Sequence, residues 1–166
     1  MDSRAILAEL PRLRRYARAM VGDRAVADDL VQDTLERGWS RLAQWQPGSD
    51  LRAWLFGIMH NLRVDQLRRP GLSTLPLEDE DIAVPIRATQ TDQLEVNDLT
   101  AALARLPEEQ RAVLLLVALE EMSYEQIAAT LGIPTGTVMS RLSRGRERLR
   151  LILEGRPTAA HLRVVR

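Results

Sequence analysis

The segment "SYEQIAATLGIPTGTVMSRLSRGRERLR" (residues 123–150) predicts two helices joined by a tight turn. Its apolar residues first follow a helical period, Gly132 and Pro134 then interrupt the pattern, and the helix resumes with five arginines and one glutamate. Ser123 and Gln126 have the spacing of a capping box, in which each side chain bonds the other residue's backbone N–H. The segment therefore carries a helix start signal, a break and a strongly basic second helix.

Small and apolar residues stand where a helix-turn-helix requires them. Counting from Tyr124, Ala128 is the small residue at the helix crossing and Gly132 is the turn residue free of Cβ constraint. Val138 is the apolar residue with which the second helix packs back. Thr135 is expected to cap that second helix, which runs to about residue 153. These positions predict a helix-turn-helix.

The last helix divides into an apolar face and a polar face when its residues are placed 100° apart. Hydroxyl groups near its N-terminus and guanidinium groups beyond them suit the major groove of DNA, because arginine pairs with guanine edges and also holds phosphates. The alternative is a solvated arginine-rich helix that merely closes a small bundle. The turn spacing, the capping box and the arginine face coincide, which favours DNA binding. The candidate contacts are Thr137, Ser140, Arg141, Arg144 and Arg148.

Composition argues against several classes of function. The 166 residues have a formal net charge of +0, no cysteine and two histidines, so disulfides and thiolate ligands are excluded and neither a metal nor a cofactor is expected. No paired nucleophile and base and no phosphate-cradling glycine loop is present, so an enzyme is not expected. Arginines interrupt the N-terminal segment and no apolar run approaches roughly 18 residues. This predicts a cytoplasmic chain without direct membrane insertion.

Helical periodicity dominates and strand-like alternation is nearly absent, so the expected fold class is all-α. Helices are expected at about 11–20, 24–43 and 51–69 in the first half, and at about 93–105 and from 107 onwards in the second. Asp23 is expected to cap the second of these helices. Three of these five helices precede a proline-rich stretch, and the other two lie between that stretch and the helix-turn-helix.

The helix at 51–69 carries an apolar stripe and a second, mixed face. Leu51, Trp54, Leu55, Ile58 and Leu62 follow the period of a core stripe, and Trp39 is also assigned to the core. Phe56 lies about 140° away from that stripe, on the face of Arg52, His60 and Arg63. Its ring either packs against the helix at 11–20 or contacts DNA, and the periodicity leaves both open.

Prolines and acids between the two halves indicate a flexible linker. Residues 78–98 carry seven acids against Arg87, whereas residues 134–156 carry six arginines against two glutamates. The predicted organisation is a first small helical domain at 1–70, a linker at 71–92, a second domain at 93–155 and a tail at 156–166. The linker acids are expected to discourage the free protein from binding DNA.

Three blocks of the sequence resemble a known family. "LPEEQRAVLLLVALEEMSYEQIAATLGIPTGTVMSRLSRGRERLR" resembles region 4 of bacterial RNA polymerase sigma factors, while "ADDLVQDTLERGW" and "LRAWLFGIMHNLRVDQLRR" resemble region 2. Their order, the linker and the short length are similar to the extracytoplasmic-function (ECF) group, over about residues 5 to 153. Met139 departs from the family pattern, because many relatives carry lysine there.

The resemblance implies a sigma factor that binds core RNA polymerase through its β′ clamp and β subunits, recognises promoter DNA and has an anti-sigma factor as a further partner. Region 4 would bind the minus-35 element through the polar face of the last helix. Region 2 would bind the minus-10 element and stabilise its melted strand, with the loop at 44–50 and the start of the next helix as the pocket and the later residues towards the duplex and its phosphates. The candidate minus-10 contacts are Gln44, Ser49, Asp50, Phe56, Asn61, Arg63, Arg68 and Arg69. The polymerase would be held by Asp28, Asp29, Leu30, Gln32, Asp33 and Glu36.

Two rival functions use parts of the same sequence. A stand-alone helix-turn-helix regulator explains residues 123–150 but gives the region 2 blocks no role. A sigma mimic that sequesters an anti-sigma factor would have lost its DNA-contacting side chains, and the arginines are present here. Initiation of transcription from defined sites with core polymerase separates a sigma factor from both.

Overall fold

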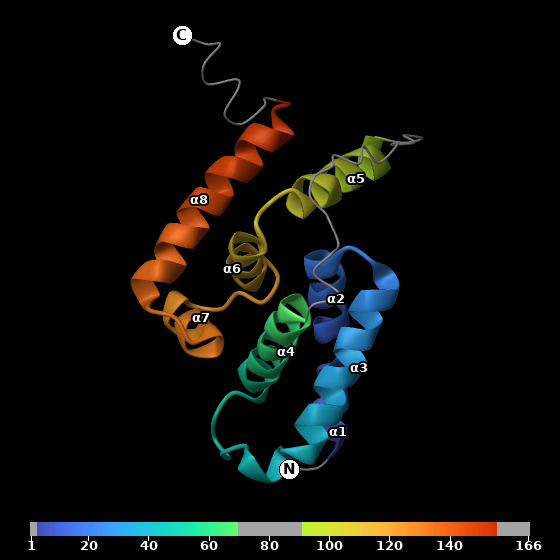
Figure 1. Ribbon diagram of the computed structural model, residues 1–166, viewed down its shortest axis with the longest axis vertical. Helices are drawn as coiled ribbons and strands as arrows, with labels where there is room; N and C mark the ends of the chain where they lie inside the picture. Colours follow the sequence, from blue (N-terminus) through green and yellow to red (C-terminus); the bar gives the residue numbers. More distant parts are fainter. Residues whose placement is uncertain (1–2, 70–90, 156–166) are drawn as a thin grey trace.

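All regular structure in the described residues, 3–69 and 91–155 of the computed structural model, is helical (Figure 1). This agrees with the all-α class expected from the periodicity. In chain order the elements are α1 (Ser3–Ala8), α2 (Leu10–Val21), α3 (Arg24–Ser40), the 3-10 turn η1 (Leu42–Gln44), α4 (Leu51–Arg68), α5 (Thr91–Ala104), α6 (Glu108–Ala118), α7 (Tyr124–Leu131) and α8 (Thr135–Leu153).

Local capping chemistry sets where the helices of the first half begin. The Asp23 carboxylate accepts a hydrogen bond from the backbone N–H of Val26 at 3.1 Å, so the predicted cap is confirmed. Asp50 caps α4 in the same way, accepting from Ala53 N–H at 3.2 Å. Helix α1 lies before the first helix expected from the sequence and was not predicted.

Helices α2, α3 and α4 pack around an apolar core that includes Leu13 and Leu30. The approach of α3 to α4 is close at Gly38, where an added Cβ would lie 2.9 Å from Cδ2 of Leu55. Because Gly38 faces α4, the next side chain turns away from the core. Trp39 is accordingly 38% exposed, and its assignment to the core was wrong.

Helix α4 is buried more widely than its predicted stripe. Leu55 and Ile58 are buried as expected, but Phe56 and Met59 are also buried. The Phe56 ring meets the Tyr16 ring of α2 edge to face, with centroids 5.0 Å apart. In this arrangement Phe56 follows the packing alternative. The stripe alone did not predict this, because α2 and α3 do not cover α4 on a single face.

The helix-turn-helix is formed by α7 and α8. Both hydrogen bonds of the predicted capping box at Ser123 and Gln126 are present, and Gly132 has the left-handed φ of 71° that the turn requires. Val138 is fully buried. The prediction that Thr135 caps α8 was wrong. Pro134 holds the cap position in extended geometry without a side-chain bond, so Thr135 is already the first helical residue.

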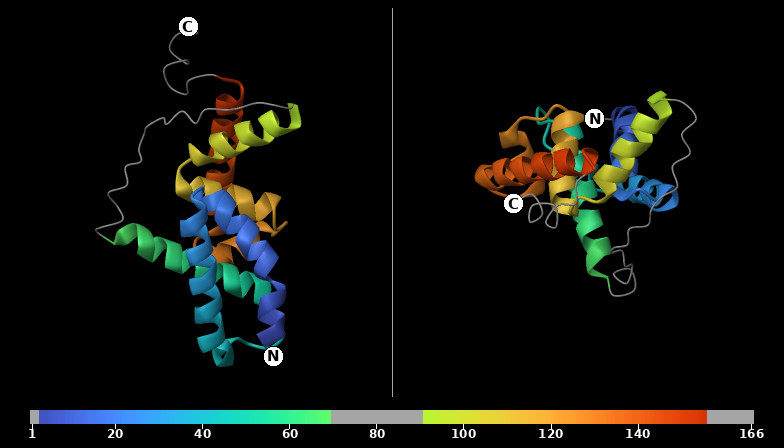
Figure 2. Two further views of the ribbon diagram at one scale, coloured as in Figure 1. Left: turned by 90° about the vertical axis from the view of Figure 1, so that its right-hand side faces the viewer. Right: turned by 90° about the horizontal axis from the view of Figure 1, so that it is seen from above.

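The two halves of the chain pack against each other rather than standing apart (Figure 2). One cluster of buried residues includes side chains from both halves, and α2 contacts α5 and α6 while α4 contacts α7. An added Cβ on Gly57 of α4 would lie 3.3 Å from the carbonyl oxygen of Thr130 in α7. Helix α5 begins at Thr91. Residues 71–90 of the predicted linker (71–92), and the tail at 156–166, lie outside the described residues.

Candidate nucleic-acid interface

Helix α8 separates its side chains as the angular analysis predicted. Val138 and Leu142 are buried, and Gly145 lies against α6, where an added Cβ would be 3.2 Å from Cδ1 of Leu114. On the other side Arg144 is exposed, whereas Thr137, Ser140, Arg141 and Arg148 are half-buried. Arg141 pairs with Glu109 of α6 at 3.2 Å, and the other four residues form a row of hydroxyl and guanidinium groups beside the packed inner face.

Apart from Phe56, the predicted minus-10 residues fall into two groups, one in the loop before α4 and one in the second half of α4 and just after it. Gln44, Ser49 and Asp50 are exposed before the helix begins. The Ser49 hydroxyl donates to the Gln46 carbonyl oxygen at 2.7 Å, which holds the loop in a turn. The second group comprises the exposed residues Asn61, Arg68 and Arg69 and the half-buried Arg63. From Asp50 to Asn61 the rise along the helix is about 16 Å.

Two of these residues are engaged in contacts within the protein in this arrangement. Phe56 is 2% exposed and packs on Tyr16. Arg63 makes a two-pronged ion pair with Glu108 of α6, with Nε 2.6 Å from Oε2 and Nη2 3.2 Å from Oε1. Its Nη1 also donates to Oε1 of Gln66 at 2.9 Å. Their roles at the minus-10 element stay predictions.

The acidic residues predicted to hold the polymerase form an exposed face of α3. Asp29, Gln32, Asp33 and Glu36 repeat at helical spacing and are all exposed. Asp28 is exposed too and pairs with Arg18 of α2 at 3.3 Å. The sixth predicted residue, Leu30, is 1% exposed and supports the helix from inside. The face therefore offers charge and amide groups rather than an apolar anchor.

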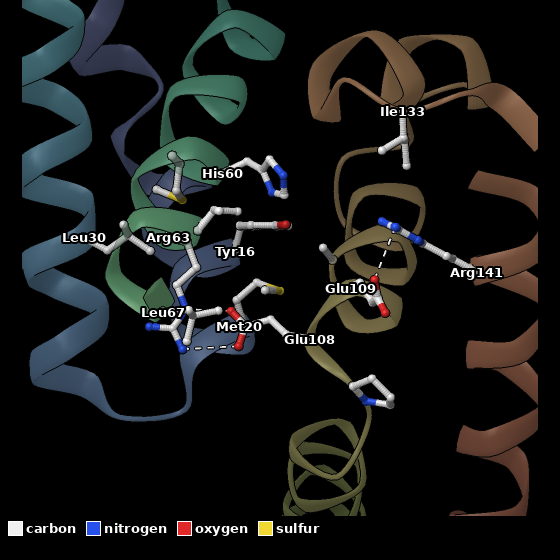
Figure 3. Close-up of a pocket in the computed structure, with 14 residues that line it drawn as sticks. Tyr16, Met20, Leu30, His60, Arg63, Leu67, Glu108, Glu109, Ile133 and Arg141 are labelled. Atoms are coloured by element: carbon white, nitrogen blue, oxygen red, sulfur yellow. Dashed lines mark hydrogen bonds and ion pairs between the residues drawn. The ribbon is translucent and has the colours of Figure 1, made fainter. Parts of the chain in front are cut away.

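A cavity of about 470 Å³ lies between the two halves (Figure 3). Apolar side chains such as Met20, Met59 and Ile133 line it together with Arg63 and Arg141. Its other lining residues include His60, whose pKa is lowered by burial and by the nearby Arg141 guanidinium, so the ring is neutral near pH 7. The hydroxyl of Tyr16 is also part of the lining, and burial raises its pKa.

Arg111 is a buried charge that sequence reasoning missed. Its guanidinium donates to the carbonyl oxygens of Leu103 at 2.7 Å, Ala104 at 3.1 Å and Leu106 at 2.6 Å, at the end of α5. It also donates to the carbonyl oxygen of Met20 in α2. The one local signal was an arginine inside the apolar run of α6. Arg111 therefore ties the α5–α6 corner to the first half.

Glu120 is a second buried charge that the sequence did not reveal. Its side chain has 0% exposure, and arginines of the first half surround it: Arg12 at 3.7 Å, Arg15 at 3.5 Å and Arg52 at 3.6 Å. Arg52 also donates to the backbone carbonyl oxygen of Glu120 at 3.0 Å. Burial raises the pKa of the Glu120 carboxyl, although the three arginines oppose the rise. No local pattern predicts partners this distant in the chain.

In residues 3–69 and 91–155 no group of three or more metal-binding side chains is close enough to hold an ion. Within the same ranges, none of the helices has the length and apolar character needed to cross a membrane.

Comparison with known proteins places both halves. Residues 6–60 match the family described as the Sigma2 domain of PhyR, and residues 97–149 match Sigma-70, region 4. The ECF RNA polymerase sigma factor EcfG of Rhodopseudomonas palustris (strain TIE-1) is 42% identical over 153 residues, which covers 89% of this chain and 82% of the relative.

Two solved structures share the arrangement over most of the chain. One is a chain of the complex of the sigma factor RpoE with the anti-sigma factor NepR from Bartonella quintana, with a TM-score of 0.76 and 36% identity over 91% of this chain and 95% of that one. The other is a chain of the complex of CnrH with the cytosolic domain of CnrY, with a TM-score of 0.68 and 27% identity over 92% and 86%.

The matches to a sigma region 2 family and to Sigma-70 region 4, together with the sigma-factor relative, define the class as sigma factors, which are DNA-binding transcription initiation factors and not enzymes. The chain belongs to the ECF RNA polymerase sigma factors.

Proposed function

We propose that this chain binds core RNA polymerase through α3, places α8 in the major groove of a minus-35 element and stabilises the melted minus-10 strand with residues around α4. The observation that carries the proposal is α8, because its inner face is packed and its outer face presents hydroxyls and then guanidinium groups. Membership of the sigma family supports the proposal that the outer face of α8 is directed towards DNA. The site of action is the cytoplasm, where the polymerase and the promoter meet.

The acidic face of α3 supports the polymerase contact. Its exposed carboxylates would meet the β′ clamp, and exposed charges of this kind contribute mainly to association rate and register. Contacts to the β subunits are implied by the family resemblance, without residues assigned to them.

An anti-sigma factor is proposed as a further partner. One of the solved complexes named above holds the sigma factor RpoE together with the anti-sigma factor NepR, and this chain is similar to that structure over 91% of its length. The identity of the regulator does not follow from the chain itself.

Run-off transcription with purified core polymerase tests the proposal. With this chain added, initiation is expected from defined promoter sites, and Arg144→Ala is expected to weaken minus-35-dependent promoters by about 1 to 3 kcal/mol if the side chain reads a base. Arg146→Ala is the matched control, since Arg146 is exposed on the same helix but outside the predicted face. A stand-alone regulator or a sigma mimic would give no initiation from any promoter, which would refute the proposal.

A further inference from the structure

Two polar side chains that line the cavity between the halves have no partner within the protein. Figure 3 shows the Tyr16 side chain of α2 and the His60 ring of α4 directed into the space that α6 and α8 face. Within residues 3–69 and 91–155 neither the Tyr16 hydroxyl nor the His60 ring has a hydrogen-bond partner. Tyr16 is only 6% exposed, and polar groups as buried as this are normally hydrogen-bonded. Both groups are therefore available to a ligand in the cavity.

The charged side chains of the lining are already paired with one another. Arg63 binds Glu108 through both carboxylate oxygens, at 2.6 and 3.2 Å. Arg141 lies 3.2 Å from the adjacent residue of α6, Glu109. Two guanidinium groups thus face two carboxylates, so the lining presents no net charge. A charged ligand would have to break one of these pairs or stay unpaired in a partly buried site, and both cost free energy.

The two groups without partners are themselves neutral near pH 7. Burial and the nearby Arg141 guanidinium lower the pKa of His60, so its ring carries one N–H donor and one acceptor nitrogen. Burial raises the pKa of Tyr16, which keeps the phenol protonated and able to donate. Both side chains can therefore bond to a carbonyl or hydroxyl oxygen of an uncharged molecule.

Apolar side chains form most of the remaining lining. Leu30 and Met59 are each 1% exposed and form the floor of the cavity, next to Met20. Leu67 is 44% exposed and the Glu109 side chain 61% exposed, so these two residues lie at a rim that is open to solvent. The volume of about 470 Å³ is typical of small-molecule sites. Water alone would find few hydrogen-bond partners on such walls.

We propose that this cavity binds a small, uncharged and mainly apolar molecule whose carbonyl or hydroxyl oxygen bonds to Tyr16 and His60. The apolar body of the ligand contacts Met20 and Met59, whose flexible thioethers adapt to different shapes. Both halves build the site, because Ile133 of the second half lines it together with these residues of the first. The inference goes beyond the proposed function and uses none of the promoter or polymerase roles.

Methionine-methyl NMR of the full chain, titrated with 1-naphthol, tests the site. The probe is uncharged at pH 7 and joins an apolar ring system to one hydroxyl. Of the five methionines in the sequence, Met20 and Met59 line the cavity, and their signals should shift saturably with a Kd of about 0.1 to 1 mM. Met139 is 50% exposed on α8, outside the lining, and should not shift. No saturable shift at the two cavity residues, or an equal shift at Met139, would overturn the proposal.

A pair of tyrosine variants tests the hydrogen bond. Tyr16→Phe removes only the hydroxyl and keeps the ring that packs on Phe56, so the variant should fold normally but bind 1-naphthol about three- to tenfold more weakly. Tyr124→Phe removes the other tyrosine hydroxyl of the chain, which lies outside the lining, and should leave the affinity unchanged. Equal affinities of the two variants would contradict the proposed role of Tyr16.

A charged analogue tests the preference for an uncharged ligand. 1-Naphthoate carries a carboxylate on the same ring system and should bind roughly fivefold more weakly than 1-naphthol, or worse, because the arginines of the lining are already paired. Tighter binding of 1-naphthoate would show that the cavity is an anion site and would overturn the proposal.

A cavity-filling variant tests the location. Val64→Phe adds a ring at a half-buried position of the lining, and should abolish the shifts that 1-naphthol causes at Met20 and Met59. Shifts that persist in this variant would place the binding elsewhere and refute the site. A failure of the proposed function would appear separately, as absent run-off transcription, because these titrations contain neither polymerase nor DNA.

Discussion

Burial and the charges of nearby arginines act in opposite directions on the pKa of the Glu120 carboxyl. Its side chain has no exposed surface, and its Oε1 lacks a hydrogen-bond donor although arginines lie nearby. Desolvation disfavours the ionised form, whereas Arg12, Arg52 and Arg15 favour it, and the balance raises the pKa. The ionised carboxylate therefore does not hold the halves together by itself. Buried ion pairs often contribute little net stability for this reason.

The raised pKa of Glu120 predicts a definite pH dependence of stability. Unfolding returns the carboxyl to its ordinary value of 4.5, so above pH 4.5 the folded state binds more protons than the unfolded state and stability falls as pH rises through the raised pKa. Urea unfolding of the unmodified chain and of Glu120→Gln from pH 4.5 to 7.5 should show the difference in unfolding free energy moving in favour of the variant. If the difference instead moved in favour of the unmodified chain as the pH rises, the raised pKa of Glu120 would be contradicted.

At the scale of one element, the α7–α8 unit shows what short-range chemistry determines. The capping box, the left-handed glycine and the inner face of α8 all involve residues a few positions apart, and each was predictable from spacing. Thr135 was mispredicted because two neighbouring residues competed for one role. Pro134 has the fixed φ that suits the residue before a helix.

Removal of the capping box should destabilise this unit by a modest amount. Ser123→Ala leaves the N–H of Gln126 without its side-chain acceptor, at an expected cost of about 1 kcal/mol in the free energy of unfolding. Chemical denaturation of the full chain measures this cost. Ser143→Ala, at an exposed position within α8, is the matched control and should change stability by less than about 0.5 kcal/mol. Equal effects of the two substitutions would show that the cap contributes nothing.

Helix α4 shows where prediction from sequence ends. Its apolar stripe was recognisable, but the burial of Phe56 depends on Tyr16, and the pairing of Arg63 depends on Glu108, 45 residues further on. The buried charges Arg111 and Glu120 were missed for the same reason. The arginines around Glu120, and Met20 as one of the acceptors for Arg111, come from the other half of the chain, and periodicity within one helix carries no information about them.

For the molecule as a whole, the shared apolar cluster joins two small units that were expected to be separate. A unit of the size of either half buries only roughly 60% of its extended-chain surface on its own, and the other half covers part of what remains. The two halves are thus expected to stabilise each other in the absence of any partner.

This mutual burial predicts one cooperative unfolding transition. Calorimetry of the full chain should give equal calorimetric and van 't Hoff enthalpies, as for a single two-state unit. Gly57→Leu should separate the transition into two, because it pushes α4 and α7 apart at their close approach. Two transitions in the unmodified chain would show that the halves unfold independently.

The distribution of tryptophan gives the molecule a built-in optical reporter. Trp39, Trp45 and Trp54 all precede α5, so the indole emission originates entirely in the first half. The half that carries α8 contains no tryptophan and does not contribute to this emission. Any change in emission that follows an event confined to α8 must therefore have been transmitted across the contact between the halves, without an attached dye.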